Sequence, residues 1–349
     1  MLKRLTAREQ IALLVESLEP TIRRAFLDAV SSIRSAISIK LLVERLERGD
    51  VGGAVDVLRI EQEAFGGLDT AIADAFNAGG LATVEDMRLR DPEGHRVMFR
   101  WNVRDPESEE WLRRHSAALV TSLTEEQRDN ARTILSAGLM RGDNPTRTAL
   151  DLVGRVSRVT GTRQGGVIGL SAQHLSAVER ARAALLSGDV EGMRAYLQLK
   201  RRDKRFDASI RKALEAGKGL DRASVDRVTG RLSDSYLKLR ADTIALHETF
   251  TALGASRDAA FRQAIAKGDV DPQLVTKTWR HTTAEHPRMQ HVAMAGQTVH
   301  FDQPFIAPDG TPIMHPHAEG VPARHTLGCK CQAEYRIDYT GKLLRQRAN

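Results

Sequence analysis

Residues 224–267 read SVDRVTGRLSDSYLKLRADTIALHETFTALGASRDAAFRQAIAK. Apolar residues recur there at helical spacing almost without a break, from Val225 to Ile265, and this pattern predicts one amphipathic α-helix. At 1.5 Å per residue, such a helix is on the order of 60 Å long. Gly230 and Gly254 are the positions at which we expect it to bend or break. The stretch therefore predicts a long spine helix.

The composition of the whole chain agrees with a helical protein. Of its 349 residues, 41% are hydrophobic, 28% are charged and only 5% are aromatic. Few aromatic residues together with abundant Ala, Leu, Arg and Glu favour helices over sheets. We predict a mainly α protein, with an elongated multi-helix body, a long spine helix and a small C-terminal α+β module.

The length of the chain indicates two or more domains, and changes in pattern suggest where they divide. We expect an N-terminal helical bundle at 1–87, a central helical region at 88–223, the spine helix at 224–270, an α+β module at 271–340 and a short basic tail at 341–349.

Local signals predict finer boundaries. Pro20 is expected in the first turn of a new helix, and Gly79 and Gly80 are expected to close the N-terminal block. Residues 99–101 are expected to form a short strand. Residues 122–125 have the Ser-x-x-Glu form of a capping box, which predicts that a new helix begins there and runs to about residue 140.

Charge and cysteine content limit the classes of function. The net charge of +7 and the isoelectric point of about 9.6 favour acidic partners such as nucleic acid. Two cysteines cannot form a disulfide scaffold, so nothing calls for a secretory compartment. Because no run approaches ~18 apolar residues and the N-terminus lacks the apolar core of a signal peptide, we expect a cytosolic setting without a membrane.

The densest basic run is KRRDKR at 200–205. Such a run is usually the solvated face of a helix, and the alternative is a patch that contacts phosphates without reading bases. Aromatic residues are too few nearby to stack single-stranded bases, so duplex DNA or an acidic protein surface is the expected ligand. The candidate contacts are Lys200, Arg201, Arg202, Lys204 and Arg205. The glycine-rich loop at 160–166 lacks the P-loop pattern, which argues against nucleotide binding.

Residues 279–331 concentrate the side chains that can hold a metal, with seven of the eleven histidines and both cysteines. Thiolate and imidazole ligands suit zinc. In a regular strand the Cα atoms of Cys329 and Cys331 would lie roughly 6.5–7 Å apart, which disfavours a disulfide between them. A local turn, which Gly328 could supply, would let both sulfurs reach one ion.

Two interpretations of this cluster follow from the sequence. In the first, a structural zinc is held by His291, Cys329, Cys331 and one of His286 or His325. In the second, these residues complete a small, loop-rich polar core without metal. Residues 299–301 and 332–339 alternate apolar with polar side chains and are expected to be half-buried strands, and residues 308–310 form a turn.

The same region carries a family resemblance. The residues concerned are Lys277, Trp279, Glu285, Arg288, His291, Gly296, Phe305, His315, Pro316 and the closing Gly328-Cys329-Lys330-Cys331. They resemble the C-terminal signature of the Mu F-like phage minor head proteins, also called head morphogenesis proteins. That family usually closes with Asn-Cys-Arg-Cys and has an Asp seven residues before the His, so this chain departs from the pattern at Gly328, Lys330 and Ala284.

The resemblance extends toward the N-terminus and covers residues 99–339. It includes Asp105-Pro106, Trp111, Gly142-x-Asn144-Pro145, Ala149, Thr160-Gly161 and Gly169-Leu170-Ser171. Residues 240–249 are similar to the family's Ile-Ala-Arg-Thr-Glu-Thr segment. His247 and Glu248 point about 100° apart on a helix, so we expect Glu248 to hold a basic group of the C-terminal module, such as Arg288, rather than to form an acid–base pair.

The resemblance implies a minor capsid protein of a tailed phage or prophage and no enzyme activity. Such a protein is bound to the portal inside the procapsid and acts in head assembly and in genome packaging, retention or ejection. Its location would be the host cytoplasm during assembly and then the capsid interior near the portal. The implied partners are the portal protein, with the major capsid or scaffolding protein and non-specific double-stranded DNA as further candidates.

Two other functions remain open from the residues. One is a zinc-dependent hydrolase, nuclease or deaminase built on the His/Cys cluster, with Glu285 or Glu319 as general base. The zinc-deaminase and His-Glu-x-x-His patterns are both absent from the sequence. The other is a general DNA-binding module, which rests on the net charge and the basic run.

Overall fold

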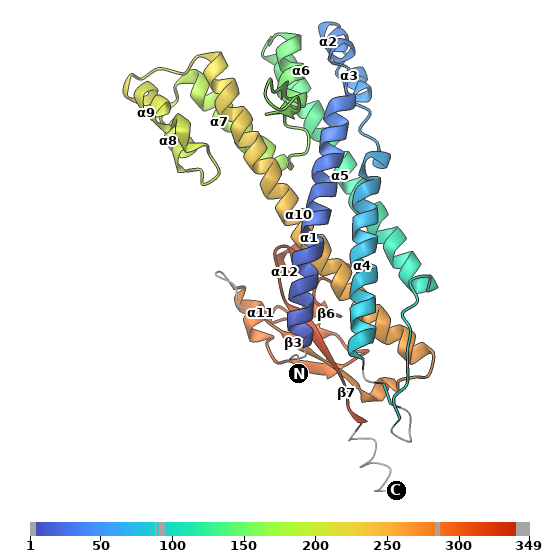
Figure 1. Ribbon diagram of the computed structural model, residues 1–349. Helices are drawn as coiled ribbons and strands as arrows, with labels where there is room; N and C mark the ends of the chain where they lie inside the picture. Colours follow the sequence, from blue (N-terminus) through green and yellow to red (C-terminus); the bar gives the residue numbers. More distant parts are fainter. Residues whose placement is uncertain (1–4, 88, 91–94, 283–286, 340–349) are drawn as a thin grey trace. The chain divides into compact units, whose positions relative to one another are not determined.

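The structure is a computed structural model that describes residues 5–87, 89–90, 95–282 and 287–339 (Figure 1). The chain is mainly α-helical, as its composition predicts, and small sheets lie near its C-terminal end. Among the described residues, no helix combines the length and the apolar character needed to cross a membrane.

The helices before the C-terminal module are, in chain order, α1 (Ala7–Ala36), α2 (Ile39–Glu47), α3 (Val51–Val57), α4 (Gly66–Asp86), α5 (Pro106–Met140), α6 (Pro145–Val153), α7 (Ala172–Ser187), α8 (Val190–Gln198), α9 (Asp207–Glu215) and α10 (Arg222–Ala266). Short 3₁₀ helices are η1 (Gln62–Phe65) and η2 (Lys204–Phe206), and a small antiparallel pair joins β1 (Arg155–Val156) to β2 (Arg163–Gln164). The C-terminal elements are η3 (Pro272–Leu274), β3 (Val275–Arg280), α11 (Met289–Ala293), β4 (Thr298–His300), β5 (Phe305–Ile306), β6 (Pro312–Ile313), α12 (Ala323–Thr326) and β7 (Gln332–Ile337).

The chain forms two compact units. Unit 1 comprises Met1–Arg23, Asp69–Ser116 and Thr243–Asn349, and unit 2 comprises Arg24–Leu68 and Ala117–Asp242. The divisions expected from the sequence follow chain order, whereas each unit gathers segments that are far apart in the sequence. The long helix α10 gives residues to both units.

The predicted spine helix is confirmed by α10, which runs for 45 residues without interruption. The glycines at which a bend was expected mark close backbone approaches instead. A Cβ atom on Gly254 would lie 2.9 Å from the carbonyl oxygen of Pro316. A Cβ atom on Gly230 would lie 3.3 Å from the Cα of Gly165. An added Cβ atom would clash with backbone at Gly254 and make only a tight contact at Gly230. The need for glycine at Gly254 therefore comes from packing rather than from flexibility.

Two predicted helix boundaries are wrong. Pro20 lies inside α1 rather than in the first turn of a new helix, and residues 122–125 lie inside α5 rather than at a capping box. In α5 the buried stripe continues through Val120, Leu123 and Gln127. Continuous burial of one helix face outweighs a local capping signal, because most helical stability in proteins comes from packing.

The helix end expected at Gly79 and Gly80 is also wrong, since α4 continues past both residues to Asp86. A Cβ atom on Gly80 would overlap the indole ring of Trp101, and one on Gly79 would overlap the side chain of Ser256. The expected strand at 99–101 is absent too. Trp101 lies there outside any helix or sheet, and its indole N–H donates to Asn77 Oδ1 at 2.8 Å.

The C-terminal part of unit 1 is built on a three-stranded antiparallel sheet in the order β4-β3-β7. β4 overlaps the strand predicted at 299–301 and β7 lies within the one predicted at 332–339, whereas the central strand β3 is not predicted. Register places Trp279 opposite Ala333 and Thr278 opposite Thr298. The predicted turn at 308–310 is confirmed between β5 and β6, where Gly310 has a φ of 81°. The predicted α+β character of the module is thus confirmed.

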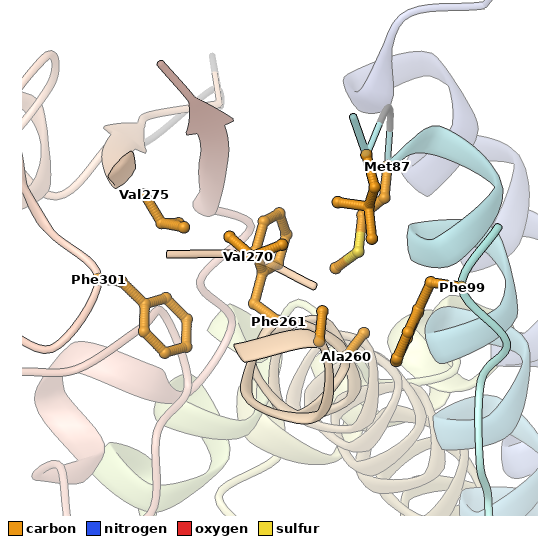
Figure 2. Close-up of a cluster of buried hydrophobic side chains, with 9 residues drawn as sticks. Met87, Phe99, Ala260, Phe261, Val270, Val275 and Phe301 are labelled. Atoms are coloured by element: carbon orange, nitrogen blue, oxygen red, sulfur yellow. The ribbon is translucent and has the colours of Figure 1, made fainter. Parts of the chain in front are cut away.

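Part of the core of unit 1 forms around the C-terminal end of α10 (Figure 2). Ala260 and Phe261 lie at its centre, with Met87 and Phe99 on one side and Val275 on the other. Each of these side chains is buried. A second cluster within the module contains Trp279, Met294, Phe305, Ala307, Ile313, Cys329, Cys331 and Ala333. Both cysteines therefore belong to a hydrophobic core.

Unit 2 is held by caps, helix packing and buried arginines. Asn144, Ser171 and Asp189 cap the N-termini of α6, α7 and α8, because each side chain accepts a backbone N–H from the first turn of its helix. α2 packs against α3 and α6, and α7 packs against α8. The guanidinium of Arg34 donates to the carbonyl oxygens of Gly166 and Ile168 at 2.5–3.1 Å.

The close approach at Gly80 gives a stability prediction. Gly80→Ala should lower the free energy of unfolding by about 1–3 kcal/mol, the usual cost of overpacking, because the Trp101 ring is held by its bond to Asn77. Urea unfolding followed by circular dichroism measures the change. The matched control is Gly67→Ala in the same helix, where a Cβ atom meets nothing within 4 Å. That change should leave stability unaltered or raise it by up to about 1 kcal/mol, and an equal loss in both variants would contradict the packing account.

Candidate metal centre

Three buried side chains meet in the module. His291 comes from α11, and Cys329 and Cys331 come from the segment that leads into β7. Cys329 Sγ lies 3.3 Å from His291 Nδ1, and Cys331 Sγ lies 3.6 Å from the same nitrogen. The ligand atoms all lie within 4.8 Å of one another, and the three residues are 1–5% exposed. These groups could hold a metal ion.

Local structure explains how both sulfurs reach one point. Gly328 has a φ of 67°, which turns the chain directly before Cys329. The backbone N–H of Cys329 donates to the carbonyl of Thr326, and the N–H of Cys331 donates to Cys329 Sγ at 3.3 Å. The cysteines are free thiols rather than a disulfide. The turn expected from the sequence is therefore present, and the expectation against a disulfide is confirmed.

The spacing fits a tetrahedral zinc site. With zinc–sulfur bonds of about 2.3 Å and zinc–nitrogen bonds of about 2.0–2.1 Å, a sulfur and a nitrogen on one ion lie about 3.5 Å apart. The two observed separations, 3.3 and 3.6 Å, lie close to this value. Two thiolates and an imidazole are also a soft donor set of the kind that zinc prefers.

The protonation of the two thiols is linked. A hydrogen bond from Cys331 lowers the pKa of the Cys329 thiol well below its usual range, and the same interaction raises the pKa of Cys331. The pair therefore behaves as one thiolate and one thiol that share a proton. A bound cation would replace this proton, because a thiol that coordinates a metal is deprotonated.

A chain of hydrogen bonds orients His291. Its Nε2 lies 3.3 Å from Nδ1 of His325, and Nε2 of His325 lies 3.0 Å from the carboxylate of Asp309. The carboxylate accepts a hydrogen bond from His325 Nε2, so His325 Nδ1 accepts a hydrogen bond from His291 Nε2, and His291 Nδ1 keeps its lone pair toward the sulfurs. Hydrogen bonds from Thr311, and then from His325 and Arg324, hold the pKa of Asp309 well below its usual range.

These hydrogen bonds correct part of the predicted ligand set. His325 was expected as a direct ligand, but it lies on the far side of the His291 ring from both sulfurs and acts through that ring. Outer hydrogen bonds of this type fix the tautomer and orientation of a metal-bound histidine. The alternative ligand His286, together with Glu285, lies outside the described residues.

Sequence reasoning did not select His317, which lies in the loop between β6 and α12. The side chain is 4% exposed, and neither ring nitrogen has a hydrogen-bond partner among the described residues. The imidazole contributes to the lowered pKa of the Cys329 thiol, after the hydrogen bonds from Cys331 and His291, whereas burial of the thiol acts in the opposite direction. The ring is not part of the group of ligand atoms that lie within 4.8 Å of one another. Its position near the cluster depends on the folded loop, so no spacing in the sequence indicates it.

Trp279, Phe305 and Lys277 of the motif pack next to the cluster. Trp279 is fully buried and makes edge contacts with the rings of His291 and Phe305, each at 5.3 Å between centroids. Lys277 has no exposed surface, and its ammonium lies 5.6 Å from the Phe305 ring centre and 5.7 Å from that of Phe301. Burial lowers the pKa of Lys277 to about 8.

The expected pairing of Glu248 with Arg288 is wrong. Glu248 Oε2 lies 2.6 Å from His115 Nε2, whereas Arg288 donates to the carbonyl of Leu327. His115 stacks on Trp111 at 4.8 Å, and its Nδ1 lies 3.9 Å from Glu319. No sequence pattern predicts this pair, because His115 and Glu248 come from different helices, α5 and α10.

The remaining motif residues shape the loops. Gly296 has a φ of 84°, and its N–H donates to the carbonyl of Trp279, which closes the turn from α11 into β4. The carbonyl of Pro316 accepts a hydrogen bond from His315 Nδ1 at 3.0 Å and faces Gly254 of α10. Both positions therefore hold chain segments around the cluster rather than donate ligands to it.

The basic run at 200–205 does not form one face of an α-helix. It lies in a turn followed by η2, and two of its arginines are paired. Arg202 makes two hydrogen bonds of 2.9 Å to Asp207, and Arg205 pairs with Asp203 at 2.6 Å. Lys200, Arg201 and Lys204 are exposed and lack an ion pair within the described part of the chain. The number of cations available to an acidic partner is smaller than the run suggests.

Comparisons of the chain with protein-family models, with curated proteins and with solved structures found no match.

The contact between Glu248 and His115 predicts a pH-dependent stability. Burial alone would lower the pKa of His115, but Glu248 and then Glu319 outweigh it and raise that pKa above its ordinary value. The stabilisation is therefore complete below the unfolded pKa of about 6.5 and is lost as the pH rises through the folded pKa.

Glu248→Gln should lower the free energy of unfolding by about 1.5–3 kcal/mol near pH 6, the net value of a hydrogen bond to a charged group. The loss should be smaller near pH 9, because His115 loses its charge as the pH rises through its folded pKa. Urea unfolding at the two pH values tests this, with the exposed Glu125→Gln on α5 as the control. Equal losses for Glu248→Gln at both pH values would contradict a charged pair.

Proposed function

We propose that the protein is a minor head protein of the Mu F-like class, bound to the portal inside the procapsid of a tailed phage or prophage. It would act in head assembly and in genome packaging, retention or ejection. The observation that carries this proposal is the joint location of the motif residues. Five residues of the C-terminal part of the resemblance, Trp279, His291, Phe305, Cys329 and Cys331, meet in one buried site of unit 1, whereas the residues of the resemblance at 142–171 lie in unit 2.

The contacts among these residues give the motif a physical meaning. Trp279, Phe305 and both cysteines share one buried cluster. A set of scattered residues that pack on one another is a constraint of the fold, and it supports a shared module rather than a chance match of spacing. The departures at Gly328 and Lys330 are compatible with it, because Gly328 supplies the turn before Cys329 and Lys330 is exposed.

We further propose that the ion at the cluster is zinc and that its role is structural. The ligand residues are almost fully buried. The cavity lined by Cys331 and His315 has a volume of about 20 Å³, whereas small-molecule sites enclose about 300–1,000 Å³. A cavity of this size has no room for a substrate, so the geometry favours a cross-link over a reaction centre.

The alternative of a zinc hydrolase or nuclease finds less support. A catalytic zinc needs an open coordination position and a general base. Glu319, one candidate base, lies 3.9 Å from Nδ1 of His115 and pairs with Arg114 at 3.3 Å. Glu285, the other candidate, is outside the described residues. We therefore propose that the protein is not an enzyme.

The proposed partners follow from the same assignment. The portal protein is the principal one, and the major capsid or scaffolding protein is a further candidate. Non-specific double-stranded DNA is another, since Lys200, Arg201 and Lys204 are exposed. The proposed location is the host cytoplasm during assembly and the capsid interior near the portal afterwards.

Co-expression with the portal protein of the same phage or prophage tests the proposal. After size-exclusion chromatography, we expect the two proteins to co-elute with about one zinc ion per copy of this chain. Replacing Cys329 and Cys331 by Ser should abolish the zinc, and His300→Asn, an exposed change on β4, should leave it intact. A chain that elutes apart from the portal would contradict the head-assembly proposal, and a zinc-free peak would contradict the metal.

A further inference from the structure

We infer that a pocket in unit 1 binds a small carboxylate with an apolar body, and that Arg257 holds the carboxylate group. The pocket is lined by residues of α1, α4, α10 and β7 and has a volume of about 370 Å³. Sites for small molecules usually enclose about 300–1,000 Å³, so its size suits a ligand. The inference goes beyond the head-assembly proposal and does not depend on it.

The apolar part of the wall comes from two hydrophobic clusters of unit 1. Ile11 and Leu253 belong to one cluster, and Met87 and Phe261 belong to the other, which Figure 2 shows. A ligand in the pocket would contact both clusters, and its apolar body would be removed from water. Removal of apolar surface from water is favourable, so this wall suits a hydrocarbon chain or ring.

Arg257 of α10 brings a cation to the same wall without a counter-ion. Its side chain is half-buried and lines the pocket, and its guanidinium carbon lies 5.6 Å from the centre of the Tyr335 ring. It makes no hydrogen bond or ion pair with the described part of the chain. A charge held largely away from water is normally paired, because its desolvation is costly. An anion in the pocket would be the missing partner.

The pKa of Arg257 agrees with this position. Burial lowers that pKa, and Tyr335, Asp86 and Glu334 offset only part of the effect. The groups of the protein that face the guanidinium therefore do not fully compensate its charge. A bound carboxylate would raise the pKa again, because an opposite charge nearby favours the charged form.

The charges of the lining favour a ligand with one negative charge. Two arginines, Arg90 and Arg257, and one acid, Asp86, leave the lining with a net charge of +1. A phosphate dianion would be repelled by Asp86. A carboxylate balances one guanidinium and can accept two parallel hydrogen bonds from it. The class of ligand that fits is therefore a monocarboxylate with an apolar body, for which octanoate is a suitable probe.

Isothermal titration calorimetry of the full-length chain with octanoate tests the inference. We expect saturable binding with a dissociation constant below about 1 mM, which is a modest affinity for a ligand of this size. Octanol has the apolar body without the charge, and acetate has the charge without the body. Each should bind at least about 10-fold more weakly than octanoate, because each lacks one of the two kinds of contact. Inorganic phosphate should also bind more weakly.

Two variants and a matched control locate the site. Arg257→Gln should weaken octanoate binding by about 10–100-fold, because it removes the hydrogen bonds between two charged groups. Ala82→Phe places a large side chain in the pocket and should abolish binding while Arg257 stays in place. Arg231→Gln changes an exposed arginine of the same helix that does not line the pocket, and it should keep the wild-type affinity. Circular dichroism checks that each variant folds.

Hydrogen exchange on the wild-type chain locates the site even if a variant fails to fold. Octanoate should protect amides near Thr83 in α4 and near Tyr335 in β7, whereas amides near Leu185 in unit 2 should not change. The inference is overturned if octanoate does not bind below about 1 mM, or if octanol binds as tightly as octanoate. It is also overturned if Arg257→Gln or Ala82→Phe keeps the wild-type affinity. None of these results bears on the portal or the zinc, which co-elution and metal content test separately.

Discussion

The pairing of β3 with β7 is the constraint on which the C-terminal module depends. It places Arg280, the last residue of β3, opposite Gln332, so Cys331 lies directly beyond the paired ends. The chain returns from β3 through α11 and is fixed by backbone hydrogen bonds of Trp279 with Gly296 and Gln297. His291 is thereby brought against the Trp279 ring. The histidine and the cysteines meet because the strands pair in this register.

The short sheets of this module depend on further contacts for their stability. Its sheets are short, and much of residues 281–331 lies in turns and irregular segments. Sheets of two or three short strands are marginal without further packing. A metal that binds only the folded state contributes its binding free energy to folding. The chain of hydrogen bonds from Asp309 through His325 to His291 prepares one ligand for this role by fixing its tautomer.

The sequence predicted those features that repeat along the chain and missed those that depend on tertiary contacts. Helical periodicity was sufficient for α10, and alternation was sufficient for β7. Alternation does not predict β3, because residues on both faces of this central strand are buried and the apolar–polar pattern disappears. Pro20 and residues 122–125 were read as boundaries because their local signals are real, yet the packed faces of α1 and α5 continue through them.

In the site, soft donors and spacing identified His291, Cys329 and Cys331. The roles of His317, Asp309 and His115 depend on loops and helices that meet only in the folded chain.

The central claim is that a metal ion at the His/Cys cluster holds the C-terminal module together. Hydrogen exchange on the purified full-length chain, before and after removal of zinc by a chelator, tests it most directly. The account predicts that amides of β3 and β7 lose protection on chelation, while those near Val225 and Leu232 of α10 keep it, because they belong to unit 2. Unchanged protection of β3 and β7 in a chain shown to have lost its zinc would contradict the account.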